Sequence, residues 1–75
     1  MSEKERIDKA VDDFAEAMKA RLNSKHKQGW HGWRGLSRET IGPRLLFNAA
    51  KGIVKLDSNS IIDTANFAMF LWRIK

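Results

Sequence analysis

A single carboxylate lies in an otherwise largely apolar stretch near the end of the sequence. The segment from Ser60 to Arg73 has the sequence SIIDTANFAMFLWR, and Asp63 is the one acid in it. An acid in such a setting commonly caps a helix, pairs with a cation, or binds a ligand such as a metal ion. Asp63 is therefore the first residue whose chemistry needs an explanation.

The three roles of Asp63 predict different neighbours. If Ser60 caps a helix, Asp63 takes the third helical position and completes a reciprocal capping box. An ion pair would join Asp63 to Arg44, Lys51 or His26. A ligand role needs further oxygen donors close by, since one carboxylate is a poor Mg²⁺ site. The capping box is the favoured interpretation, and the other two stay open.

A second group of residues suited to binding lies in the middle of the chain, in the sequence KHKQGWHGWRG. Cations interleaved with tryptophans can bind single-stranded nucleic acid or a nucleotide, because the cations attract phosphate and the flat rings stack on bases. The alternative, favoured for the tryptophans, is that both rings fold into the small core. His26 and His31 lack nearby cysteine or carboxylate ligands, so no zinc site is expected. The candidate residues of this basic loop are Lys25, Lys27, Trp30, Trp33, Arg34 and Arg38.

Charge is distributed unevenly along the chain. Residues 1–18 hold six acids and three bases, a net charge of −3. Residues 19–44 hold seven bases and one acid, a net charge of +6, and the remaining residues add +2. The basic character of the chain is therefore concentrated around the loop, as in proteins that bind anionic partners.

Length and composition limit the possible classes of protein. A chain of 75 residues forms one domain whose core is marginal by itself, so self-association is expected to add stability. The sequence has no cysteine, which is compatible with a reducing cytoplasm. Neither a signal peptide nor an apolar run of about 20 residues is present, so we expect a soluble cytoplasmic protein that does not bind a membrane.

Hydrophobic spacing indicates the helices that carry these residues. It predicts an all-α fold, a three-helix small domain over residues 1–75, with helices at about 2–23, 38–51 and 58–74 and the basic loop at 25–36. The first helix has apolar residues at steps of three and four from Ile7 to Leu22. The second has one apolar face that includes Ile41, Leu45 and Ala49.

Capping residues set the expected helix ends. Ser2 with Glu5 has the form of a capping box, and Ser37 can cap the second helix. Gly42 and Pro43 fall in its early turns, which predicts a kink or a later start. Gly52 is expected to end this helix in a left-handed conformation. Asp57 or Ser58 is expected to cap the third helix.

The third helix is apolar around almost its whole circumference, from Ile61 to Ile74. A helix of this kind is buried on more than one side. Two helices of the same small chain cover only part of it, so we expect a homodimer contact on the rest, and a different protein partner is the alternative. The residues expected at this interface are Phe67, Phe70, Leu71 and Trp72.

Two segments carry a resemblance to a known family. KHKQGW at residues 25–30 and DTANFAM at residues 63–69 resemble the HKGGW and DVANFAM segments of short phage-encoded proteins and MazG-like nucleotide pyrophosphohydrolases. The resemblance spans roughly Phe14 to Arg73. It implies an all-α fold that packs helices between subunits, and Mg²⁺ held in active members by acids from two helices, an E-x-x-E-type cluster and an E-x-x-D pair.

The chain departs from this family pattern at the positions that would bind the metal. Asp63 matches the last acid of the E-x-x-D pair, but Ser60 stands where its glutamate would be. The segment 43–51, where the other cluster would lie, contains no acid. We therefore expect no cofactor and no catalytic residue. Mg²⁺ at Asp63 belongs only to the alternative of a residual pyrophosphohydrolase whose site is completed across subunits.

The expected function is that of a non-catalytic, phage-type accessory protein that binds another protein, such as a host enzyme or a defence component. Its location would then be the host cell cytoplasm. Binding of nucleic acid or a nucleotide through the basic loop is the first alternative, and residual nucleotide hydrolysis is the second. We also expect a second copy of the chain as a partner, in a homodimer.

Overall fold

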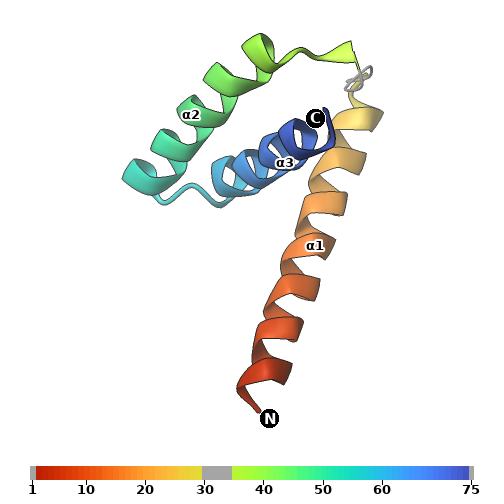
Figure 1. Cartoon of the computed structure of the whole chain (residues 1–75), viewed down its shortest axis with the longest axis vertical. Helices are drawn as coiled ribbons and strands as arrows, with labels where there is room; N and C mark the ends of the chain where they lie inside the picture. Colours follow the sequence, from red (N-terminus) through yellow and green to blue (C-terminus); the bar gives the residue numbers. More distant parts are fainter. Residues whose placement is uncertain (1, 30–34, 75) are drawn as a thin grey trace.

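The computed structural model describes residues 2–29 and 35–74, and in these ranges the chain is all-α. The helices are α1 (Glu3–Lys27), α2 (Arg38–Lys55) and α3 (Ser58–Ile74). The helices α2 and α3 form a hairpin, and α1 packs on the other side of α3 (Figure 1). The predicted fold class is confirmed. Within the described ranges, no helix is long and apolar enough to cross a membrane.

The predicted helix starts agree with the structure. Ser2 accepts a hydrogen bond from the Glu5 amide at 3.1 Å, and the Glu5 side chain accepts one from the Ser2 amide at 3.4 Å, which completes the capping box. Ser37 accepts from the Thr40 amide at 3.2 Å and caps α2. Of the two alternatives drawn from Gly42 and Pro43, the later start does not occur, because α2 begins at Arg38 and continues through the proline.

The predicted end of α2 at Gly52 is also wrong, because the helix continues to Lys55. Leu56 has the left-handed conformation, with φ 53° and ψ 39°. Gly52 is buried where α2 meets α3, and a Cβ atom built on it would lie 2.8 Å from Cγ1 of Ile61. This glycine is needed for the close approach of two helices, not for a turn.

The core lies between α2 and α3. Ile41, Phe67 and Phe70 are its fully buried apolar residues among those described, and the two phenylalanine rings meet edge to face with centroids 6.1 Å apart. Phe67 and Phe70 were expected at a homodimer interface, and this part of the expectation is corrected: both are buried inside the chain. Leu71 is half-buried, whereas Trp72 is 63% exposed. Six partly buried residues complete the core: Leu22, Leu36, Leu45, Met69, Leu71 and Ile74.

The N-terminal half of α1 projects beyond the other two helices (Figure 1). A helix of 25 residues is about 37 Å long, and the longest dimension of the molecule is 41 Å. Only the C-terminal half of α1 reaches α3, through residues such as Met18, Arg21 and Leu22. The projecting half of α1 also carries apolar residues, and no described helix of the same chain covers them.

Candidate functional site

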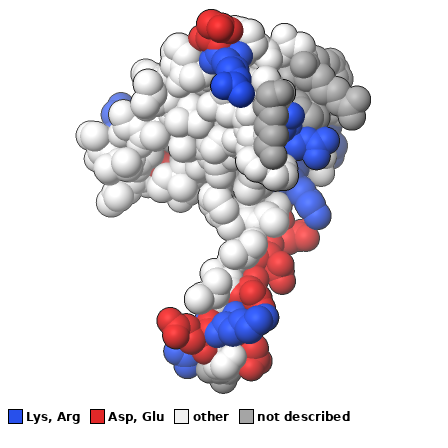
Figure 2. Space-filling model, in the orientation of Figure 1, with Lys and Arg blue, Asp and Glu red and all other residues white. Residues whose placement is uncertain are grey.

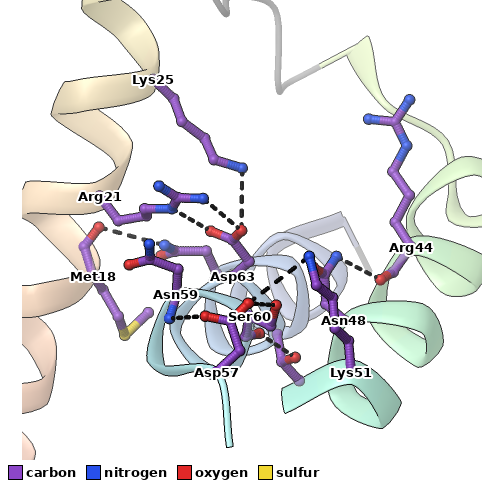
Figure 3. Close-up of polar contacts among 12 residues, drawn as sticks. Met18, Arg21, Lys25, Arg44, Asn48, Lys51, Asp57, Asn59, Ser60 and Asp63 are labelled. Atoms are coloured by element: carbon purple, nitrogen blue, oxygen red, sulfur yellow. Dashed lines mark hydrogen bonds and ion pairs between the residues drawn. The ribbon is translucent and has the colours of Figure 1, made fainter. Parts of the chain in front are cut away.

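The carboxylate of Asp63 joins α1 to α3. The Arg21 guanidinium donates two hydrogen bonds to it, from Nε to Oδ1 at 2.9 Å and from Nη2 to Oδ2 at 3.1 Å. Nζ of Lys25, one turn further along α1, lies 3.4 Å from Oδ2. Figure 3 shows both cations reaching from α1 toward the acid. A two-point arginine contact of this kind fixes geometry as well as charge.

This ion pair is well shielded from water. The Asp63 side chain is 10% exposed and that of Arg21 is 30% exposed. Burial acts to raise the pKa of Asp63, but the hydrogen bonds from Arg21 and the charges of Lys25 and Arg21 outweigh it, so the pKa lies below its usual range. The hydrogen bond to Asp63 in turn raises the pKa of Arg21. Asp63 is therefore ionised at neutral pH and balanced by two cations.

The capping role favoured for Asp63 is wrong, because Asp57 caps α3. Oδ1 of Asp57 accepts from the Asn59 amide at 3.2 Å, and Oδ2 accepts from the Ser60 hydroxyl at 2.7 Å. The hydrogen bond from Ser60 is the main reason that the pKa of Asp57 is lowered. Asp57 was one of the two predicted caps of α3, so that prediction is confirmed.

The ion-pair interpretation of Asp63 is right in kind but wrong in its partners. The cations come from α1, whereas the sequence suggested Arg44, Lys51 or His26. Arg44 extends away from Asp63 (Figure 3), and Lys51 pairs instead with Asp57 at 3.8 Å. Arg21 and Lys25 are four residues apart, so they lie on one face of α1. This spacing could have identified them as a pair of cations.

Asn66 forms a second polar contact between the same two helices. Its Nδ2 donates to the main-chain oxygen of Met18 at 3.4 Å, and the residue is 3% exposed. Its Oδ1 is buried and has no hydrogen-bond partner among the described residues. Because this hydrogen bond is long and Oδ1 is unsatisfied, Asn66 stabilises the contact between α1 and α3 less than the ion pair does.

The residues around Asp63 do not fit a magnesium ion. Both carboxylate oxygens accept from Arg21, and Lys25 lies beside one of them. A divalent cation would have to displace these charges and would gain one carboxylate in return. Among residues 2–29 and 35–74, no group of three histidine or acidic side chains is placed to hold a metal.

The candidate residues of the basic loop are only partly described. Lys25 is bound to Asp63 and also lies 5.9 Å from the centre of the Phe67 ring. Lys27 ends α1 and Arg38 begins α2, and both are exposed. Trp30, Trp33 and Arg34, together with His31, lie outside the described residues. The nucleic-acid interpretation of this loop stays a prediction.

A surface that the sequence analysis did not identify lies on α2. Phe47, 67% exposed, and Val54, 80% exposed, lie on the side of the helix opposite the buried Ile41 and Gly52, in a row with Pro43 and Ala50. This row is called the α2 seam. Two further exposed residues, Leu46 and Ile53, widen it on one edge, and Lys51 and Lys55 border the other. A hollow of about 490 Å³ lies along the seam, lined by Phe47, Ala50, Lys51, Val54 and Lys55.

A second apolar surface lies on the projecting half of α1. Ile7 is 55% exposed, Val11 61% and Phe14 39%. These three residues, called the α1 stripe, continue the row that reaches α3 through Met18 and Leu22. Figure 2 shows uncharged surface along one side of the projecting segment next to the body, acids along the opposite side, and charged residues on both sides of its tip.

Spacing could have revealed the α2 seam. Its residues lie at positions 43, 47, 50 and 54, which repeat in steps of four and three, as in helices that pack side by side. Proline and alanine at two of these positions weaken the pattern, and Gly52 suggested that the helix ended before Val54. The apolar residues of the α1 stripe were identified from their spacing, and the structure shows that the stripe is exposed.

The chain was compared with known proteins in three ways. A scan against protein-family models, a search of curated proteins and a search of solved structures each returned no match. The resemblance to MazG-like pyrophosphohydrolases stays a prediction based on its two segments.

Proposed function

We propose that this protein is a non-catalytic module that functions by binding another polypeptide through its exposed apolar helix faces. The observation that carries this proposal is the α2 seam, a continuous apolar row on the face of α2 opposite the core. Such a row adds nothing to the stability of the isolated chain, whereas another protein chain can cover it and remove it from water.

The form of the seam indicates what it binds. Side chains spaced in steps of four and three fit between the side chains of a second helix at a shallow crossing angle. Phe47 supplies a large rigid ring near the middle of the row, a residue type that is enriched at protein interfaces. Lys51 and Lys55 at the edge favour a partner helix that carries acids.

The resemblance to phage-encoded accessory proteins suggests a host enzyme or a defence component as a partner. The proposal is supported also by the chemistry at Asp63, which holds two helices together and offers no free carboxylate for catalysis. The polar centre of the molecule thus stabilises the fold, and the apolar surface remains for binding.

Affinity capture with matched variants tests this function. The immobilised wild-type protein is compared with Val54→Glu in the α2 seam and with Ala20→Glu on the exposed face of α1, since each variant adds one negative charge at an exposed position. Wild type and Ala20→Glu are expected to capture the same partner polypeptides. Val54→Glu is expected not to capture them. Equal retention by all three proteins would contradict the role of the seam.

The two alternatives are tested by direct assays. Turnover of nucleoside triphosphates with Mg²⁺ or Mn²⁺ above the blank, lost in Asp63→Asn, would support the residual hydrolase. Binding of a single-stranded oligonucleotide that weakens steeply as salt rises would support the basic loop, because phosphate contacts release counterions. We expect neither the turnover nor the oligonucleotide binding.

A further inference from the structure

We propose that the α2 seam is covered by the α1 stripe of a second copy of this chain, in a two-fold dimer that forms the contact twice. This inference rests on the proposed function, since it names one partner for the apolar faces described above. It commits to pairing of unlike helices, α1 with α2 of the other copy, and not α1 with α1 or α2 with α2.

The α2 seam matches in spacing and length the α1 row that consists of the α1 stripe and the half-buried Met18. The apolar row of α1 occupies positions 7, 11, 14 and 18, and the α2 seam occupies positions 43, 47, 50 and 54. Both rows advance in the order four, three and four, so their side chains can alternate along a common interface. Each row spans three turns of helix, or about 17 Å. Neither surface extends beyond the other.

Charge selects the unlike pairing. The projecting part of α1, residues 3–18, carries six acids and three bases, a net charge of −3. Helix α2 carries Arg38, Arg44, Lys51 and Lys55 against the acid Glu39, a net charge of +3. Pairing α1 with α1 or α2 with α2 would bring like charges together, whereas α1 with α2 attracts.

Individual residues at the edges of the rows agree with this choice. Glu3 and Asp8 border the α1 stripe, lying four residues before Ile7 and three before Val11. Lys51 and Lys55 border the α2 seam. The Lys4 partner of Asp8 is 85% exposed, so that pair is weak and leaves Asp8 able to exchange partners on association.

The arrangement of the helices allows both contacts to form together. Helices α1 and α2 lie on opposite sides of α3 (Figure 1). The α1 stripe faces the side on which α3 lies, but below its end, and the α2 seam faces away from α3. In the proposed dimer, a two-fold rotation brings α2 of the second copy against the α1 stripe of the first. The same rotation brings the second α1 stripe onto the first α2 seam, as two-fold symmetry requires.

The exposed area of the chain is large enough for such a dimer. Its accessible surface is 5777 Å², whereas a folded monomer of 8.6 kDa exposes about 4,700 Å². The excess of about 1,100 Å² exceeds the ~800 Å² that each partner buries in a standard interface. The projecting α1 and the outer face of α2 both expose large apolar side chains, and these are the two surfaces that the dimer covers.

Cross-linking of two single-cysteine variants tests the pairing. The chain has no cysteine, so Val11→Cys in the α1 stripe and Ala50→Cys in the α2 seam each introduce a unique thiol. The variants are treated with a short thiol-to-thiol cross-linker, first separately and then as a mixture. The expected result is a covalent dimer that forms in the mixture at least tenfold more than in either variant alone.

Two results would overturn the inference. A stronger cross-link in one variant alone would show that like helices pair, and a strictly monomeric wild type with no cross-link in the mixture would show that this dimer does not form. The proposed function is judged separately: it survives a monomeric wild type if Val54→Glu still loses captured proteins, and it falls if that variant retains them. Helical content measured by circular dichroism confirms that each variant is folded.

Discussion

At the scale of single residues, Asp63 links the first helix of the chain to the third. Its contact with Arg21 joins two residues that are 42 positions apart in the sequence. Removing one partner of a shielded ion pair leaves the other charge without its hydrogen bonds, which costs more than the pair itself contributes. Arg21 and Lys25 would be left side by side on α1 without the acid that balances them.

Replacing Asp63 by asparagine is therefore expected to destabilise the protein by about 1–3 kcal/mol. The comparison is Asp13→Asn, which breaks the Lys9–Asp13 pair on the exposed surface of α1, where both side chains are more than 60% exposed. That variant is expected to lose less than about 0.5 kcal/mol. Urea unfolding, monitored by circular dichroism, measures the loss of stability in both variants. Equal losses would contradict the structural role of Asp63.

The lowered pKa of Asp63 predicts how stability depends on pH. In the unfolded chain the carboxyl titrates near pH 4, and in the folded chain it titrates lower. The stabilisation is therefore fully present above about pH 4 and is lost as the pH falls through the folded pKa. The difference in unfolding free energy between wild type and Asp63→Asn should be large at pH 7 and should shrink toward pH 2. A difference that is independent of pH would contradict the ion pair.

At the scale of the elements, two unusual backbone positions shape the α2–α3 hairpin. Gly52 allows α3 to approach α2 closely, and Leu56 turns the chain from one helix to the next. Both positions reverse the usual preference, since a glycine lies inside the helix and a leucine has the left-handed conformation that glycine favours.

Substituting Gly52 by alanine should destabilise the protein, although alanine favours helix by about 1 kcal/mol. Its Cβ would lie 2.8 Å from Cγ1 and 3.2 Å from the main-chain nitrogen of Ile61, and overpacking of this kind costs about 1–3 kcal/mol. Thermal unfolding measures the change in stability that Gly52→Ala causes. In an Ile61→Ala background the Cγ1 atom is gone, so the cost should be smaller. A stabilised Gly52→Ala protein would show that the helices are not in close contact here.

Substituting Leu56 by glycine should stabilise the protein by about 0.5–1 kcal/mol, since glycine adopts the left-handed conformation without strain. The leucine side chain is 81% exposed and contributes little packing to the single chain. The control is Lys55→Gly at the last residue of α2, which should destabilise by up to about 1 kcal/mol. If both substitutions lower the midpoint of urea unfolding, the left-handed turn at Leu56 is wrong.

Local patterns predicted the elements well, but not where those elements pack. Ser2, Ser37 and Asp57 cap the helices as expected, because capping depends on residues only a few positions apart. Gly52 was interpreted as a helix end because its role depends on Ile61 in another helix. The partners of Asp63 were missed for the same reason, since no local rule specifies which face of α1 meets α3.

At the scale of the whole molecule, the chain is an α2–α3 hairpin with a long helix attached at one end. The core of the hairpin is small, with three fully buried apolar residues among those described. The projecting α1 and the outer face of α2 expose more apolar side chains than the core buries. Such a balance is unusual for a chain that remains alone, and it is the reason for proposing association.

The candidate binding surface was only partly predictable from the sequence. Self-association was expected from the short length and from the apolar third helix, but the residues named for the contact were Phe67, Phe70, Leu71 and Trp72. The structure uses Phe67 and Phe70 for its own core and leaves Phe47 and Val54 exposed instead. The sequence shows that apolar surface is in excess, but the packing of α2 on α3 decides which part of it is exposed.

Sedimentation equilibrium of the wild-type protein, with Val54→Glu and Ala20→Glu measured beside it, determines whether the chain associates through the α2 seam. A dimer of the 8.6 kDa chain is expected for wild type and for Ala20→Glu, whose added charge lies away from the α1 stripe. Val54→Glu is expected to be a folded monomer, because it places a charge within the apolar contact. A wild-type protein that stays monomeric at all concentrations, or a Val54→Glu protein that dimerises equally well, would show that the chain does not dimerise through the α2 seam.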